Sequence, residues 1–112
     1  MIQIEQATAI AEKHLLDIAR EAMIDLIWVR SPQETPYGWL FRYASKKYIE
    51  TGNMSYAIGG NSPFVILKSD GSIVSTGTAR SIDYYLSLIE EALRSGKFEY
   101  PLSIIQTMDG DK

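Results

Sequence analysis

The chain has 112 residues, of which 46% are hydrophobic and 22% charged, with a formal net charge of −3 and no cysteine. This composition is ordinary for one globular domain, and we expect residues 1–112 to form a single one. The absence of cysteine excludes a disulfide framework, a thiolate metal site and a cysteine nucleophile. The acidic balance, with no basic cluster longer than Lys46-Lys47, argues against nucleic acid as a partner.

The amino terminus has no basic region followed by an apolar stretch, and no apolar run approaches the roughly 18 residues that a membrane span requires. We therefore expect neither a targeting segment nor a membrane partner, and we expect a cytoplasmic location of the bacterial kind.

The first element is an amphipathic helix over residues 4–22. Its apolar residues recur at steps of three and four, which places them on one helical face, and charged residues take most of the other positions. The apolar positions are Ile4, Ala7, Ala11, Leu15, Ile18 and Ala22. A helix of this kind covers another part of the structure.

Two strands follow, separated by a loop. Residues 24–30 are β-branched or aromatic in character, which predicts a strand, and the two prolines in residues 31–36 predict an exposed loop. Residues 37–44 predict a second strand.

The second strand carries alternating aromatic residues. Trp39, Phe41 and Tyr43 share one face, which must be buried, because three exposed aromatic side chains in a row would form an aggregation-prone patch. The opposite face carries Leu40 and Arg42, and we expect it to be mixed and partly wet.

The middle of the chain predicts a long connection and a β-hairpin. Residues 45–57 have no clean period and leave room for a turn of helix. Residues 64–68 are a fully apolar strand, residues 69–72 supply a tight turn, and residues 72–76 return as the partner strand.

A second helix closes the domain, capped by Ser81 and ended by Gly96. It is predicted to bury Ile82, Tyr85, Leu86, Ile89, Ala92 and Leu93. Residues 98–105 are expected to add a docked segment or an edge strand, and residues 106–112 to form a frayed tail.

This order of elements, with hairpins in place of crossovers, predicts an α+β fold. We expect an N-terminal helix, an antiparallel sheet of about four strands that is covered on one face, and a C-terminal helix packed on the sheet.

The glycine-rich stretch before the apolar strand does not have the layout of a phosphate-binding loop. Such loops lead into a helix whose free N–H groups hold the anion, whereas here a strand follows, and Pro63 removes one donor. Gly60 and Asn61 are better explained as residues that accept left-handed backbone angles, with Pro63 at the start of a strand.

The titratable and nucleophilic residues do not form a recognisable catalytic set. His14 is the only histidine and lacks partners at metal-ligand spacing, so we expect a partly buried histidine. No serine lies in a known nucleophile motif. The carboxylate pairs Glu90-Glu91 and Asp109 with Asp111 are explained by solvation. The sequence therefore predicts no enzyme activity, no metal site and no cofactor, with a small hydrolase kept as a remote alternative.

An ordered set of short motifs, followed by a tyrosine-containing helix, resembles the YrhB-type domain, also described as the immunity protein 35 family. The resemblance covers nearly the whole chain, and its positions look like scaffold residues. They are Gly38, Trp39, Phe41, Tyr43, Gly60, Asn61, Pro63, Val65, Asp70, Gly71, Gly77 and Thr78.

The resemblance implies a small bacterial α+β protein that binds and neutralises a toxin encoded beside it. An inhibitor of this kind needs a rigid complementary patch and no reactive group. Specificity then lies in loops, which makes residues 31–37 and 46–56 the candidate contact segments. The candidate protein-binding side chains are Glu34, Tyr37, Tyr48, Glu50 and Tyr56.

Two further possibilities remain open at this point. The apolar residues between positions 98 and 105 suggest a chaperone-like protein that holds unfolded clients, and members of the resembled family have also been regarded as chaperone-like. If the same segment forms an edge strand, it offers a route to a homodimer.

Overall fold

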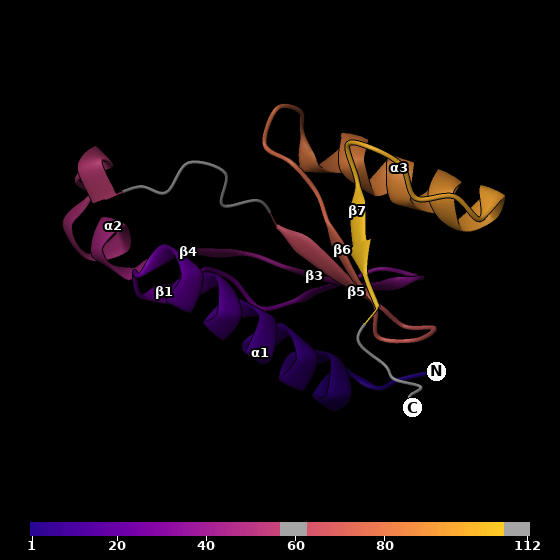
Figure 1. The fold of residues 1–112 in the computed structure, drawn as a ribbon, viewed down its shortest axis with the longest axis horizontal. Coiled ribbons are helices and arrows are strands. Elements are labelled where there is room, and N and C mark those ends of the chain that lie inside the picture. Colours follow the sequence, from indigo (N-terminus) through magenta and orange to yellow (C-terminus); the bar gives the residue numbers. More distant parts are fainter. Residues whose placement is uncertain (57–62, 107–112) are drawn as a thin grey trace.

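The computed structural model describes residues 1–56 and 63–106, which form an α+β fold as predicted (Figure 1). The elements in chain order are α1 (Ile4–Ala22), β1 (Leu26–Trp28), β2 (Gln33–Glu34), β3 (Gly38–Phe41), β4 (Tyr43–Ser45), α2 (Lys46–Thr51), the 3-10 helix η1 (Met54–Tyr56), β5 (Phe64–Leu67), β6 (Ile73–Ser75), α3 (Ile82–Ser95) and β7 (Ser103–Ile105). The turn of helix expected after residue 45 is found as α2.

The strands form one sheet of five and a separate pair. The larger sheet has the order β2-β3-β5-β6-β7 with antiparallel neighbours, and β1 pairs with β4. About four strands were expected. Seven are found in the described residues: β2 lies inside the segment predicted as a loop, β7 confirms the edge strand predicted between residues 98 and 105, and the strand predicted over residues 37–44 is divided into β3 and β4.

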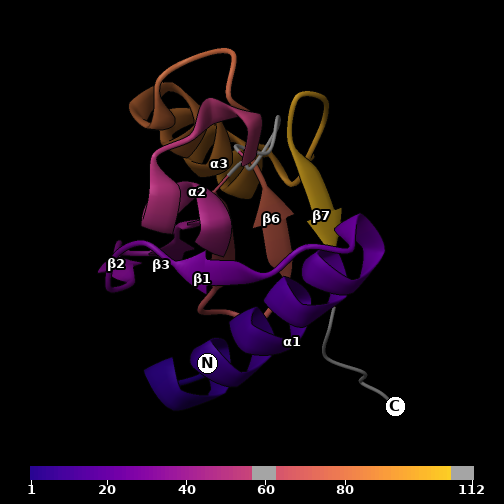
Figure 2. The ribbon, with the colours of Figure 1, turned by 90° about the vertical axis from the view of Figure 1, so that its left-hand side faces the viewer.

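The larger sheet is covered on both faces, which corrects the expectation of one covered face. Figure 2 shows α1 and α3 on opposite sides of it. One buried cluster joins α1 to Trp39, Phe64 and Ile66, and a second joins α3 to Leu40 and Val65. Side chains that alternate along β3 and β5 therefore enter two different cores.

Leu40 shows the consequence of the second core. Its residue is 1% exposed, so the prediction of a partly wet face is wrong at this position. The physical reason is that α3 packs on that face and contributes Tyr85, Ile89 and Ala92 to the same cluster. Burial of a side chain the size of leucine contributes about 1.5–3 kcal/mol to folding.

The predicted aromatic face is buried as expected, and Phe64 lies at its centre. The ring centroid of Phe64 is 5.7 Å from that of Phe41, 6.1 Å from Tyr43 and 6.2 Å from Trp28. The ring of His14 meets Phe64 edge-on at 4.7 Å. This cluster ties β3, β4 and β5 to β1 and α1.

The strand predicted over residues 37–44 is divided into β3 and β4. After Phe41, which pairs with Phe64, the chain leaves the larger sheet, and Tyr43 pairs with Trp28 of β1. The carbonyl of Arg42, at the break, accepts a hydrogen bond of 3.0 Å from the N–H of Val29. Residues with one continuous strand pattern thus belong to two different sheets. The pattern itself does not indicate where the chain leaves one sheet for the other.

The ends of α3 follow the predicted capping residues. The Ser81 hydroxyl accepts a hydrogen bond of 3.3 Å from the N–H of Tyr84, and Gly96 ends the helix with φ of +80°. The prediction that Leu93 is buried is wrong, since it is exposed. It stands one residue beyond the buried Ala92, and this step of about 100° turns it away from the sheet.

The predicted hairpin turn joins β5 and β6. Gly71 has φ of +79°, and the Asp70 carboxylate accepts a hydrogen bond of 2.9 Å from the N–H of Ser72. The left-handed angles predicted for Gly60 and Asn61 lie outside the described residues, as does the frayed tail from residue 107 onward.

Candidate protein-binding surface

A groove of about 690 Å³ lies between the carboxyl end of α1 and the α2–η1 segment. It is lined by Leu16, Ala19, Arg20, Met23, Ile24, Asp25, Ser45, Lys47, Ser55 and Tyr56. Among the five candidate contact residues, Tyr56 lines this groove, while Tyr48 and Glu50 lie on α2, the helix that forms one of its walls.

The groove is bordered by apolar side chains that are open to solvent. Met23 is 88% exposed, Leu16 59% and Tyr56 41%. Met23 and Leu16 were not predicted as contact residues, because each fits the apolar content of a helix and its end. Exposed apolar residues gathered around a concavity are typical of protein interaction sites.

Met23 also has an unusual backbone conformation. It follows α1 in the left-handed region, with φ of +59° and ψ of +40°, and its N–H donates to the carbonyl of Ala19. Glycine is the usual residue at this position after a helix, because a side chain there costs about 1 kcal/mol. A methionine where a glycine is usual is the signal in the sequence that could have pointed to this site.

The charges around the groove are mixed. Arg20 and Lys47 contribute cations and Asp25 an anion. The Lys47 Nζ atom lies 5.1 Å from the centroid of the Tyr56 ring, within the range of a cation–π interaction. The groove therefore combines apolar surface with a net positive lining in a chain of net negative charge.

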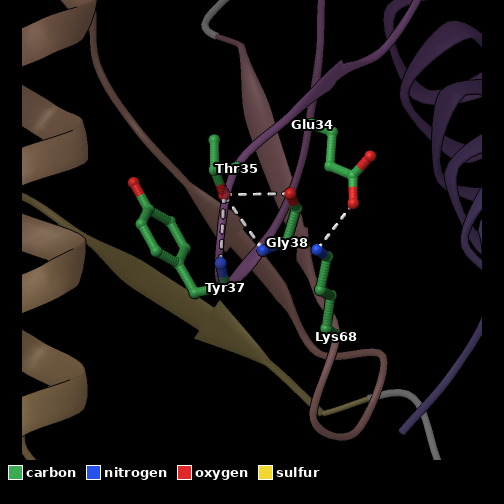
Figure 3. Close-up of polar contacts among 5 residues, drawn as sticks. All are labelled: Glu34, Thr35, Tyr37, Gly38 and Lys68. Atoms are coloured by element: carbon green, nitrogen blue, oxygen red, sulfur yellow. Dashed lines mark hydrogen bonds and ion pairs between the residues drawn. The ribbon is translucent and has the colours of Figure 1, made fainter.

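The other two candidates, Glu34 and Tyr37, lie at the turn between β2 and β3 (Figure 3). Thr35 holds this turn: its Oγ1 donates to the Gly38 carbonyl at 2.9 Å and accepts from the Gly38 N–H at 3.0 Å. The Glu34 carboxylate pairs with Lys68 Nζ at 2.7 Å. Hydrogen bonds and an ion pair therefore make this a well-defined corner.

Glu34 and Tyr37 point to different sides of the corner (Figure 3). The half-buried Tyr37 ring lies on the α3 side, where its hydroxyl donates to the carbonyl of Leu86 at 3.3 Å. Burial raises the pKa of Tyr37, Glu90 adds to this, and the hydrogen bond with Thr35 opposes it. Tyr37 therefore contributes to packing between the sheet and α3.

The five candidates fall into two groups at opposite ends of the molecule. Gly38 pairs with Leu67 beside the 69–72 turn, whereas β4 leads directly into α2 at the other end (Figure 1). Glu34 and Tyr37 thus belong to one end, and Tyr48, Glu50 and Tyr56 to the other. One compact interface does not bring both groups together.

The motif residues that the structure describes, which exclude Gly60 and Asn61, lie in the scaffold or beside it. Trp39, Phe41 and Tyr43 are buried, Pro63 precedes β5 and its carbonyl accepts from Thr76, and Thr78 is exposed. A Cβ at Gly38 would lie 2.4 Å from the carbonyl oxygen of Ile66, so the neighbouring strand requires glycine there. Glycine is thus explained at position 38 by close backbone approach.

The surroundings of His14 are described for residues 1–56 and 63–106. The half-buried ring lies beside Phe64, and the described residues that line the groove next to it are Lys13, Asp17 and apolar residues. Burial lowers the pKa of His14, Asp17 acts in the opposite direction and Lys13 reinforces the effect. Across residues 1–56 and 63–106, no three His, Asp or Glu side chains gather as metal ligands.

None of the described helices has the length and apolar content needed to cross a bilayer.

A sequence model of the family described as Immunity protein 35 matches residues 5–87 of the chain. The chain is also similar to the "Uncharacterized protein YrhB" of Escherichia coli (strain K12), with 36% identity over 73 residues, which cover 65% of this chain and 73% of that protein. No solved structure shows a significant match. The family match runs from α1 into α3 and spans well over half of the sequence, which confirms the resemblance. This chain therefore belongs to the Immunity protein 35 family.

Proposed function

We propose that this chain neutralises a protein toxin by forming a stable complex with it through the groove between α1 and α2. The observation that carries the proposal is the exposed apolar border of the groove, formed by Leu16, Met23 and Tyr56. Membership in a family of immunity proteins supports a protein as the partner. Tyrosine and methionine are enriched at such interfaces, where their side chains fill pockets of the partner.

The charges of the groove indicate what the partner offers. Arg20 and Lys47 outnumber Asp25 around it. A partner with an apolar anchor and an acidic rim would match both properties, and charge complementarity of this kind accelerates association. The proposed inhibition is steric: the toxin surface that this chain covers is no longer accessible to the toxin's own target. No step of the proposal requires a reactive group on this chain.

The left-handed Met23 supports the groove as the binding surface. Its backbone conformation costs stability, and its side chain is exposed, so packing within the chain does not compensate the cost. A strained residue with an exposed apolar side chain is what we expect at a surface that binds a partner. Binding would bury the Met23 side chain and offset the cost in the complex.

Co-expression with the product of the neighbouring gene tests the proposal. The expected results are rescue of growth and a complex that co-purifies in stoichiometric amounts. Tyr56→Ala and Leu16→Ala should each raise the dissociation constant at least about tenfold, the effect expected of a central interface residue. Their side chains are exposed in the free chain, so the variants should remain folded.

The second group of candidates supplies the matched control. Glu34→Gln and Tyr37→Phe change the far end of the molecule and should leave the dissociation constant unchanged. If these two variants abolished rescue while Tyr56→Ala and Leu16→Ala did not, the surface would be the β2–β3 corner and the groove would be rejected. Absence of both rescue and complex with the wild-type chain would remove the toxin-binding function.

A chaperone-like activity is the second candidate, favoured by the exposed side chains of Tyr100 and Ile105. It predicts that the protein suppresses aggregation of unrelated unfolded clients at stoichiometric amounts. Strict dependence on one partner would count against it. A cytoplasmic site of action stays a prediction, which fractionation of the native cells checks.

A further inference from the structure

We propose that two copies of this chain pair through their β7 strands and form one continuous sheet across a two-fold axis. The inference does not rest on the proposed function, and β7 lies outside the residues that match the family. Within residues 1–56 and 63–106, β7 is an end strand of the larger sheet, paired on one side with β6. An edge strand presents backbone donors and acceptors that can pair with another strand.

The two edges of the sheet differ in their protection. The other edge, β2, has two residues, is flanked by Pro32 and Pro36, and carries Glu34 in an ion pair with Lys68. Proline and charge block edge-to-edge pairing, as does short length, a feature that the three-residue β7 shares with β2. By contrast, no charged residue occurs between Glu99 and Asp109, the stretch that contains β7.

The chemistry of β7 favours a second copy as the occupant. In an antiparallel pair of identical strands centred on Ile104, Ile104 faces Ile104 of the second copy and Ser103 faces its Ile105, so a charge at position 104 would meet its own sign. The uncharged Ser103–Ile105 segment avoids that repulsion. Ile104 and Ile105 are both exposed in the free chain, so pairing would remove apolar surface from water on both faces of the sheet.

The apolar surface continues beyond the strand. Ile105 pairs with Ile73 and, together with Ile10 of α1, forms the apolar part of the groove beside His14, which has a volume of about 470 Å³ and also contains Lys13 and Asp17. Pairing at the edge would extend this groove across the axis. The paired segment is short, so we expect a weak dimer, comparable with the small interfaces of transient complexes.

Sedimentation of the full chain between about 10 µM and 1 mM tests the dimer, a range that suits weak association. The expected result is a shift from monomer to dimer mass as concentration rises. Ile104→Lys and Ile104→Glu should each raise the dissociation constant at least about tenfold, because like charges would face one another across the axis. Mixing the two variants should restore a dimer. If a variant failed to dimerise because it was unfolded, mixing it with the oppositely charged variant would not restore the dimer.

Gln33→Lys adds the same charge to the opposite edge and should leave the dimer intact. Because the chain has no cysteine, Ile104→Cys also gives a clean probe: a short bismaleimide should link two copies, while Gln33→Cys should not. Monomer mass at 1 mM, failure of the mixed variants to associate, or equal crosslinking from Gln33→Cys would each overturn the proposal.

Discussion

Gly77 lies directly against the ring of Tyr85: a Cβ at position 77 would stand 2.6 Å from the Tyr85 hydroxyl oxygen and 3.0 Å from its Cζ. Tyr85 is buried in the core beneath α3, so its ring cannot swing away freely. The glycine thus permits the connection between β6 and α3 to pass close over a packed aromatic side chain.

Gly77→Ala is therefore expected to lower the free energy of unfolding by about 1–3 kcal/mol, the usual cost of overpacking a core. Tyr85→Phe in the same chain should recover part of this loss, because it removes the nearest atom. Denaturant unfolding of the two single variants and the double variant measures the coupling. Strict additivity would show that the two residues do not meet as described.

Met23→Gly should stabilise the protein by about 0.5–1 kcal/mol, because glycine adopts the left-handed conformation without the penalty of a Cβ. The matched control is Gly96→Ala at the end of α3, where φ is +80° and the added Cβ would meet no described atom within 4 Å beyond its local backbone. The free energy of unfolding of Gly96→Ala should fall by about 1 kcal/mol, from backbone strain alone. Thermal or denaturant unfolding reports both changes.

The same Met23→Gly variant should bind the proposed partner more weakly while being the more stable protein. Opposite signs for stability and binding distinguish a residue kept for contact from one kept for folding. If binding were unchanged and stability increased, Met23 would have no part in the interface.

His14 predicts a stability change with pH. Its pKa in the folded protein is lowered, mainly because burial disfavours the charged imidazolium. The unfolded chain therefore binds the proton at higher pH than the folded one, and stability should fall as pH drops below the ordinary value of 6.5. The loss is complete once the pH lies below the folded-state pKa.

His14→Gln should remove this part of the pH dependence, measured as the difference in unfolding free energy between pH 7.5 and pH 5. The substitution also replaces the edge contact with Phe64, so the absolute stability is expected to change at both pH values. The informative quantity is the change in unfolding free energy with pH. An unchanged slope would mean that another group is responsible.

Tyr37→Phe should lower the free energy of unfolding by about 0.5–1.5 kcal/mol, since it removes the hydrogen bond to the Leu86 carbonyl. The side chain is half-buried against α3, so its apolar contacts should survive the change. Thr35→Ala, which removes the hydroxyl that holds the neighbouring turn, is the comparison at the same corner. No loss in Tyr37→Phe would place the hydroxyl in contact with solvent.

Local patterns were sufficient for much of the fold. The apolar repeat from Ile4 predicted α1, the Asp70-Gly71 turn predicted the β5–β6 hairpin, and Ser81 with Gly96 predicted the ends of α3. These features depend on backbone angles and side-chain spacing within a few residues. The local sequence specifies both directly. The short motifs also indicated the family that the comparison confirms.

The apolar residues of β5 and β3 indicate that both faces of the larger sheet are covered, whereas we predicted one covered face. β5 is apolar at every position, as expected for a strand buried on both faces, and Leu40 alternates with the aromatic residues of β3. Recognising the second core required knowing that α3 lies opposite α1.

What only the tertiary structure decided are the relationships between residues that are distant in the chain. The division of residues 37–44 at Arg42 depends on the separate partners β5 and β1, and the role of Gly77 depends on the position of the Tyr85 ring. The groove likewise arises because α2 and η1 approach the end of α1 and leave Met23 and Tyr56 around one concavity. Periodicity specifies which face of an element is apolar, whereas packing between elements determines which apolar side chains are buried and which remain available to a partner.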